Sequence, residues 1–130
     1  MDDNTAGLLR LHVKSAQLVR LKDGLLVRLA EVERKLAQLN ELVKDPRLKR
    51  RVEPLYMKLK HDVGHQKRAA KVALHKSETL RDEIFRKPID VAAVERGFEA
   101  ALKVSARVSK ELDLLNRSLD ELLASCGVLN

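Results

Sequence analysis

The chain has 130 residues with 26 lysines and arginines against 19 aspartates and glutamates, a formal net charge of +7 at pH 7. Only two phenylalanines and one tyrosine are aromatic, so the core must be built from Leu, Val, Ile and Ala, as in long helices. A single cysteine excludes a disulfide framework within one chain, and no apolar run reaches the roughly 18 residues of a membrane-spanning helix. We therefore expect one cytoplasmic domain spanning residues 1–130 that makes no membrane contact.

The first expected element is a helix over residues 7–43. Its large apolar side chains recur every seven residues, at Leu11, Leu18, Leu25, Val32 and Leu39. This spacing is typical of the buried face of a coiled-coil helix. Thr5 is the predicted N-cap, because its hydroxyl can accept a hydrogen bond from the first turn.

The second expected helix covers residues 46–84, after the start signal Asp45-Pro46. One face is predicted from positions three or four apart, with small or polar side chains in its middle. These positions are Leu48, Val52, Leu55, Leu59, Val63, Gln66, Ala70, Ala73, Ser77, Leu80 and Ile84. Pro54 falls eight residues into this helix and predicts a kink or a restart there.

The third expected helix covers residues 90–125, with Asp90 as N-cap and Gly127 just beyond its end. Residues 85–89 form the connection that precedes it. Short connections make sequential helices antiparallel. The sequence therefore predicts an all-α, elongated antiparallel three-helix bundle with coiled-coil-like packing.

The positive charge is concentrated on the second helix. Residues 47–84 hold eleven lysines and arginines against five carboxylates, whereas residues 89–124 hold five against seven. If the apolar face points inward, Arg50, Arg68 and Lys71 point most directly outward. A cationic surface of this kind favours an acidic partner.

No pattern in the chain indicates catalysis. There is no glycine-rich phosphate loop, and no nucleophile with a neighbouring base can be argued from spacing. His61 and His65 are four residues apart, as in metal-binding helices, but they lack the glutamate of a zinc protease, and solvent-facing histidines are the simpler interpretation. We expect neither an enzyme, nor a cofactor or metal, nor a small-molecule substrate.

Two segments resemble the tubulin-binding cofactor A family of tubulin-specific chaperones. The first runs from Leu11 to Asp23 (LHVKSAQLVRLKD) and resembles the family's opening helix. The second begins at Asp45-Pro46 and runs from Leu48 as LKRRVEPL, with Gln66-Lys67-Arg68 falling where some members have Gln-Arg-Arg. The resemblance covers roughly residues 9–80 at low identity.

The resemblance implies a non-catalytic cytosolic protein that captures β-tubulin and takes part in αβ-heterodimer assembly with the other tubulin cofactors, in association with the cytoskeleton. The expected protein-binding residues are outward polar side chains of the first two helices, with a tyrosine as apolar anchor. They are Lys14, Arg20, Arg50, Tyr56, Lys58, Arg68 and Lys71.

Two other classes of function stay open from the sequence. A basic helical protein can bind nucleic acid, although the chain lacks the aromatic residues that stack on bases. A spectrin-like bundle can self-associate, with the weak middle of the second helix packed across chains. The expected oligomeric state is a monomer or a weak dimer.

Overall fold

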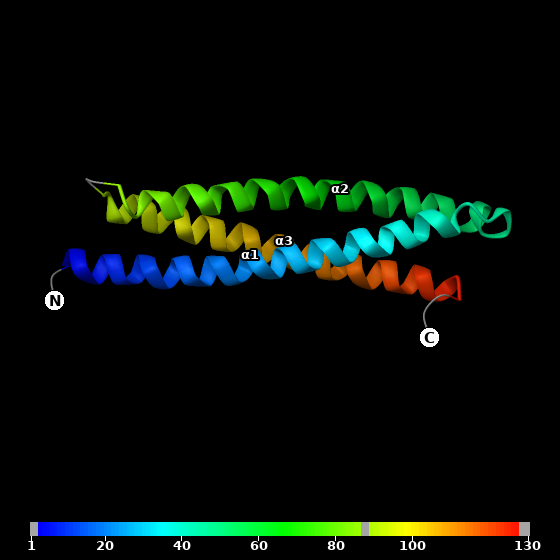
Figure 1. Cartoon of the computed structure of the whole chain (residues 1–130), viewed down its shortest axis with the longest axis horizontal. Helices are drawn as coiled ribbons and strands as arrows, with labels where there is room; N and C mark the ends of the chain where they lie inside the picture. The colour runs from blue at the N-terminus through cyan, green and yellow to red at the C-terminus, as the bar shows by residue number, and fades with distance from the viewer. Residues whose placement is uncertain (1–2, 87–88, 128–130) are drawn as a thin grey trace.

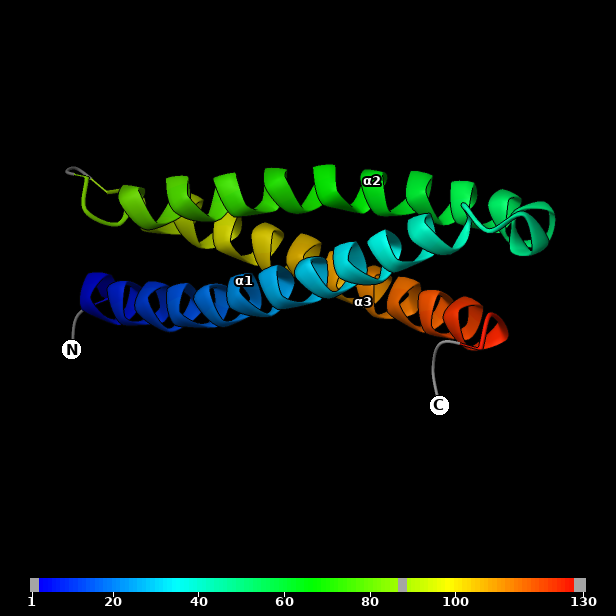
Figure 2. The same ribbon diagram turned by 45° about the vertical axis from the view of Figure 1, so that its right-hand side comes forward.

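The computed structural model describes residues 3–86 and 89–127, and these form three long helices (Figure 1). They are α1 (Asp3–Leu42), α2 (Pro46–Glu83) and α3 (Val91–Ser125). α1 and α3 run in the same direction and α2 returns antiparallel to both, as two views of the rod show (Figures 1 and 2). The predicted elongated, antiparallel three-helix bundle is confirmed.

The caps of α2 and α3 are those the sequence predicts. The Asp45 carboxylate accepts a hydrogen bond from the Arg47 backbone N–H at 2.9 Å, with Pro46 as the first helical residue. The Asp90 carboxylate accepts one from the Ala93 N–H at 3.1 Å, and Gly127 has the positive φ of 78° that suits a residue just past a helix end. The predicted connection over residues 85–89 includes residues 87–88, which lie outside the described part.

The expected cap at Thr5 is wrong, and of the two outcomes predicted for Pro54, a kink or a restart, the restart is excluded. Thr5 lies inside α1, not at its cap, because the helix already begins at Asp3. α2 continues through Pro54 to Glu83, so no restart occurs. One proline removes a single backbone hydrogen bond, and buried side chains on both sides, Val52 and Tyr56, hold this turn against the rest of the bundle.

The core follows the seven-residue spacing. The five α1 residues Leu11, Leu18, Leu25, Val32 and Leu39 are all at most 1 % exposed. Burial of each contributes about 1.5–3 kcal/mol relative to an exposed position. Two apolar clusters lie along the rod, one around Leu25, Val52 and Leu112 and the other around Leu11, Leu80 and Phe98.

A layer of small side chains also lies in the interior, formed by Ala73, Ser77 and Ser105. The predicted weak middle of α2 is therefore buried within its own chain. It is not a free surface available for packing across chains.

One step of the predicted α2 face is wrong. Leu55 is 51 % exposed, whereas Tyr56 is buried and its hydroxyl donates a hydrogen bond to Asn40 Oδ1 at 3.1 Å. The inward positions step from Val52 to Tyr56 and then to Leu59 and Val63. Steps of three or four residues both keep side chains on one face of a helix. The side-chain amide of Asn40 on α1 accepts the hydrogen bond of the buried Tyr56 hydroxyl.

Five ion pairs join α1 to α3, and four of them show the register of the two helices. These four join Arg10 to Glu95 at 3.1 Å, Lys14 to Glu99 at 2.9 Å, Arg28 to Asp113 at 2.8 Å and Lys35 to Asp120 at 2.8 Å. In each of these four pairs the two residues are 85 positions apart in the sequence. A constant separation is what two parallel helices in one register require. These pairs neutralise the charges of four cations of α1 and four carboxylates of α3.

Candidate functional site

The strongest candidate is the outward side of α2. Four exposed cations lie there, Arg50, Lys58, Arg68 and Lys71, and we call them the cationic surface of α2. Arg50 and Arg68 are eighteen residues apart, about five helical turns, so they point in the same direction. The buried side chains Val52, Val63 and Ala70 occupy the opposite side of the helix. The four cations extend over about 32 Å of helix at 1.5 Å per residue.

The cationic surface is not neutralised by neighbouring carboxylates. From Pro46 to Ser77, the carboxylates of α2 are Glu53 and Asp62. Glu53 forms an ion pair with Lys49 at 3.9 Å, and half-buried Asp62 lines a groove toward α3. Within residues 3–86 and 89–127, none of the four cations forms an ion pair. Their charges face solvent and are available to a partner.

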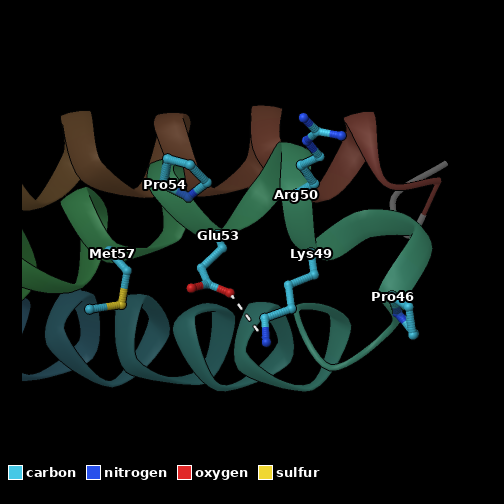
Figure 3. A pocket seen from close by; sticks show the side chains of 6 residues that line it. All are labelled: Pro46, Lys49, Arg50, Glu53, Pro54 and Met57. Atoms are coloured by element: carbon cyan, nitrogen blue, oxygen red, sulfur yellow. Dashed lines mark ion pairs between the residues drawn. The ribbon is translucent and has the colours of Figure 1, made fainter.

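An apolar hollow adjoins the first of these cations (Figure 3). Pro54 and Met57 line it together with Arg50, Lys49 and Glu53, and the last two form an ion pair. The hollow has a volume of about 480 Å³, and Met57 is 53 % exposed. It offers a partner apolar contact beside a guanidinium, the combination found at the centre of many protein interfaces.

The sequence prediction missed this hollow because it expected Tyr56 to be the apolar anchor. Tyr56 is 7 % exposed and belongs to the core. The one sequence signal for the hollow was Met57, an apolar residue that lies away from the buried positions of α2.

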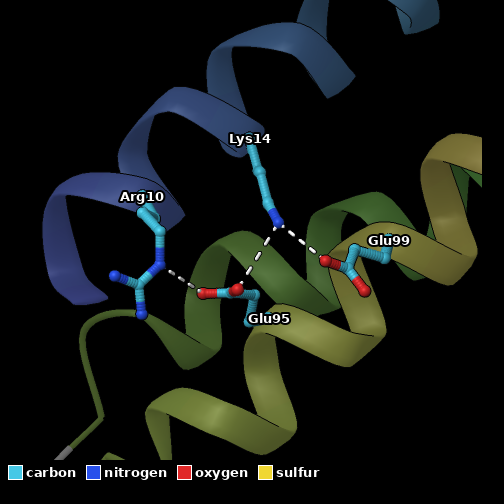
Figure 4. Close-up of polar contacts among 4 residues, drawn as sticks. All are labelled: Arg10, Lys14, Glu95 and Glu99. Carbon is cyan, nitrogen blue, oxygen red and sulfur yellow. Dashed lines mark hydrogen bonds and ion pairs between the residues drawn. The ribbon is translucent and has the colours of Figure 1, made fainter. Parts of the chain in front are cut away.

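Lys14 faces α3 rather than solvent, so the expectation that it points outward is wrong (Figure 4). Its Nζ lies 2.9 Å from Glu99 Oε1 and 3.6 Å from Glu95 Oε1. The Glu99 hydrogen bond is the main reason that the pKa of Lys14 is raised, against the opposing effect of burial. A hydrogen bond from Arg10 correspondingly lowers the pKa of Glu95. Lys14 therefore stabilises the α1–α3 contact and is not part of the candidate site.

Arg20 is exposed as predicted, but it lies on α1 and not with the four cations of α2. The structure thus brings together four of the seven expected residues. It places Arg20 on another helix, and Lys14 and Tyr56 in packing contacts.

The histidines of α2 share its outward side. His61, His65 and His75 are exposed. Within the described ranges, no group of three or more His, Cys, Asp or Glu side chains is arranged to hold a metal ion. His61 and His65 thus add polar surface beside Arg68.

A second line of cations lies on α3 and was not singled out from the sequence. Arg96, Lys103, Lys110 and Arg117 recur every seven residues and are all exposed. Their seven-residue spacing was the available signal. Residues 89–124 carry five lysines and arginines against seven carboxylates, whereas residues 47–84 carry eleven against five. The lower net charge of its helix makes this line a weaker candidate for an acidic partner.

Comparison with known proteins adds no relative: no family model, no curated protein and no solved structure matches the chain. In the described residues, none of the helices has the length and apolar character needed to cross a membrane. The candidate site therefore stands on the geometry and charge of α2.

Proposed function

We propose that this protein is a non-catalytic binding protein that captures an acidic protein partner on the cationic surface of α2. The observation that carries the proposal is the stretch from Pro46 to Ser77. There, the outward side of a rigid helix presents four cations that no carboxylate of the described chain neutralises. Long-range attraction by such a surface raises association rates by about 10- to 1000-fold.

β-Tubulin is the partner to test first. The resemblance to tubulin-binding cofactor A includes the start of α2, and with it Arg50, and the Gln66-Lys67-Arg68 segment, so two of the four cations lie in the resembling segments. On this proposal, the protein acts in the cytosol by stoichiometric capture of β-tubulin for αβ-heterodimer assembly. The hollow beside Arg50, with Met57, provides the apolar contact.

The test is a titration of labelled protein with purified tubulin and, separately, with duplex DNA, each at several salt concentrations. We expect saturable one-to-one binding of tubulin and only weak binding of DNA. Tight binding of DNA that falls steeply with salt, without tubulin binding, would contradict the proposal and favour a nucleic-acid-binding protein.

A further inference from the structure

The side of the bundle between α2 and α3 differs from the other two sides in its ion pairs. α1 is joined to α3 by the ion pairs described above, and to α2 by Lys22–Glu78 at 3.8 Å and Lys67–Glu33 at 2.9 Å. Across residues 3–86 and 89–127, no ion pair joins α2 to α3. The charges along this side are left facing outward.

A groove of about 430 Å³ opens on this side. Its apolar lining comes from both helices and consists of Leu55, Leu59, Leu115 and Leu122. Leu55 is 51 % exposed, so its side chain can be reached from solvent. The groove is shallow and open, so it suits a helical surface better than an enclosed small molecule.

Two further exposed apolar residues extend this groove along the rod. Val72 lies two heptads after Lys58 on the same stripe of α2, and Leu114 lies one heptad before Glu121 on the same stripe of α3. Their exposed fractions are 64 % and 44 %. They add exposed apolar side chains on the same side of the bundle, beyond the groove that Leu55 lines.

The groove is lined by Lys58 and half-buried Asp62 from α2 and by Glu121 from α3. Lys58 lies on the α2 edge and Glu121 on the α3 edge, and both are exposed. Arg51 donates a hydrogen bond to the Ser125 carbonyl at 3.1 Å, which sets the antiparallel register of α2 against α3. In that register, Lys58 and Glu121 lie within about one helical turn of each other along the rod.

A two-fold axis along the groove makes these edges complementary between two copies of the chain. The rotation puts α2 of one copy opposite α3 of the other at the same height, so Lys58 meets the partner's Glu121, and the contact occurs twice. The exposed apolar side chains of the two copies then cover each other. The symmetry requires only that Lys58 and Glu121 lie on opposite sides of the groove at similar heights along the rod.

We propose that a second copy of the chain docks on the α2–α3 groove and forms a symmetric dimer. Lys58, one of the four cations of the cationic surface, is covered in this dimer, whereas Arg50, Arg68 and Lys71 lie on other stripes of α2 and stay exposed. The proposal does not depend on the identity of the acidic partner, because three cations of each copy are still available to it.

The test is the mass in solution, measured by sedimentation velocity across the micromolar range. We expect a reversible dimer for the wild-type chain. Lys58→Glu and Glu121→Lys each place like charges at both contacts, so each should weaken dimerisation at least about tenfold. The double variant reverses both edges and should restore the dimer.

Leu55→Asp should also abolish the dimer, whereas Val27→Asp on the exposed side of α1 is the matched control and should leave it intact. Helical circular dichroism and melting temperature check that each variant folds. A wild-type monomer at every concentration would overturn the proposal, even if a foreign amphipathic helix binds in the groove. Single variants that dimerise like the wild type, or a double variant that does not recover, would overturn it too.

Discussion

Two helical glycines allow the packing of α2 on α3 to be tested with matched substitutions. A glycine inside a helix costs about 1 kcal/mol relative to alanine. At Gly64 an added Cβ would meet only Arg68 Nη1 at 3.7 Å, an ordinary contact with a flexible side chain. Gly64→Ala should therefore gain about 1 kcal/mol of unfolding free energy and raise the melting temperature by about 4 °C.

Gly97→Ala should have the opposite sign. An added Cβ there would lie 2.6 Å from Leu80 Cδ2, inside the contact distance of two carbon atoms. Leu80 is 8 % exposed and belongs to the apolar cluster around Phe98, so its displacement costs about 1–3 kcal/mol. This exceeds the gain in helix propensity, and we expect a net loss of about 1 kcal/mol.

The assay is urea unfolding followed by circular dichroism, with Leu80→Ala as a third variant. When Leu80 is truncated the obstacle disappears, so Gly97→Ala should stabilise the Leu80→Ala background by about 1 kcal/mol. If Gly97→Ala stabilises the wild-type chain as much as Gly64→Ala does, α2 and α3 do not approach as closely as described, and the reasoning fails.

Three further predictions concern the core and its ion pairs. Asp120→Asn should lower the free energy of unfolding in urea by about 1 kcal/mol, because it leaves the 8 % exposed side chain of Lys35 with a weaker partner. Lys35→Met should be nearly neutral, and equal losses in the two variants would contradict this. Phe98→Ala should cost about 3–5 kcal/mol and Phe85→Ala almost nothing, since the first is fully buried and the second 77 % exposed; similar melting temperatures would contradict the fold. The pKa of Glu95 is lowered from 4.5, so its contribution is present above that value and lost as pH falls through the folded-state pKa. Melting temperatures of Glu95→Gln and wild type should differ at pH 7 and converge in acid; a constant difference would refute this.

The fold was predictable because its determinants are local. The seven-residue spacing from Leu11 to Leu39 defines the buried face of α1 without reference to the other helices. Asp45 and Asp90 cap their helices through residues two or three positions away. Each of these signals lies within a short segment of sequence, so it can be recognised without knowing which helices contact each other.

The misplaced residues depend on contacts between helices. Tyr56 can be buried only because Asn40 on α1 accepts its hydroxyl, and nothing within α2 indicates that partner. Lys14 points inward because the register between α1 and α3 places Glu95 and Glu99 beside it. That register follows from the lengths of both connections and of the antiparallel helix between them. The exposure of the α2 cations could be predicted because no other helix approaches their side of α2.

The most direct test of the cationic surface is a comparison of two triple charge reversals in tubulin binding. One variant carries Arg50→Glu, Arg68→Glu and Lys71→Glu on α2, and the other carries Lys103→Glu, Lys110→Glu and Arg117→Glu on α3. Both lower the net charge by the same amount at exposed helix positions. We predict that the α2 variant associates with β-tubulin at least about tenfold more slowly and with less salt dependence, while the α3 variant stays close to wild type. Equal loss in both variants, or no loss in either, would contradict a binding surface on α2.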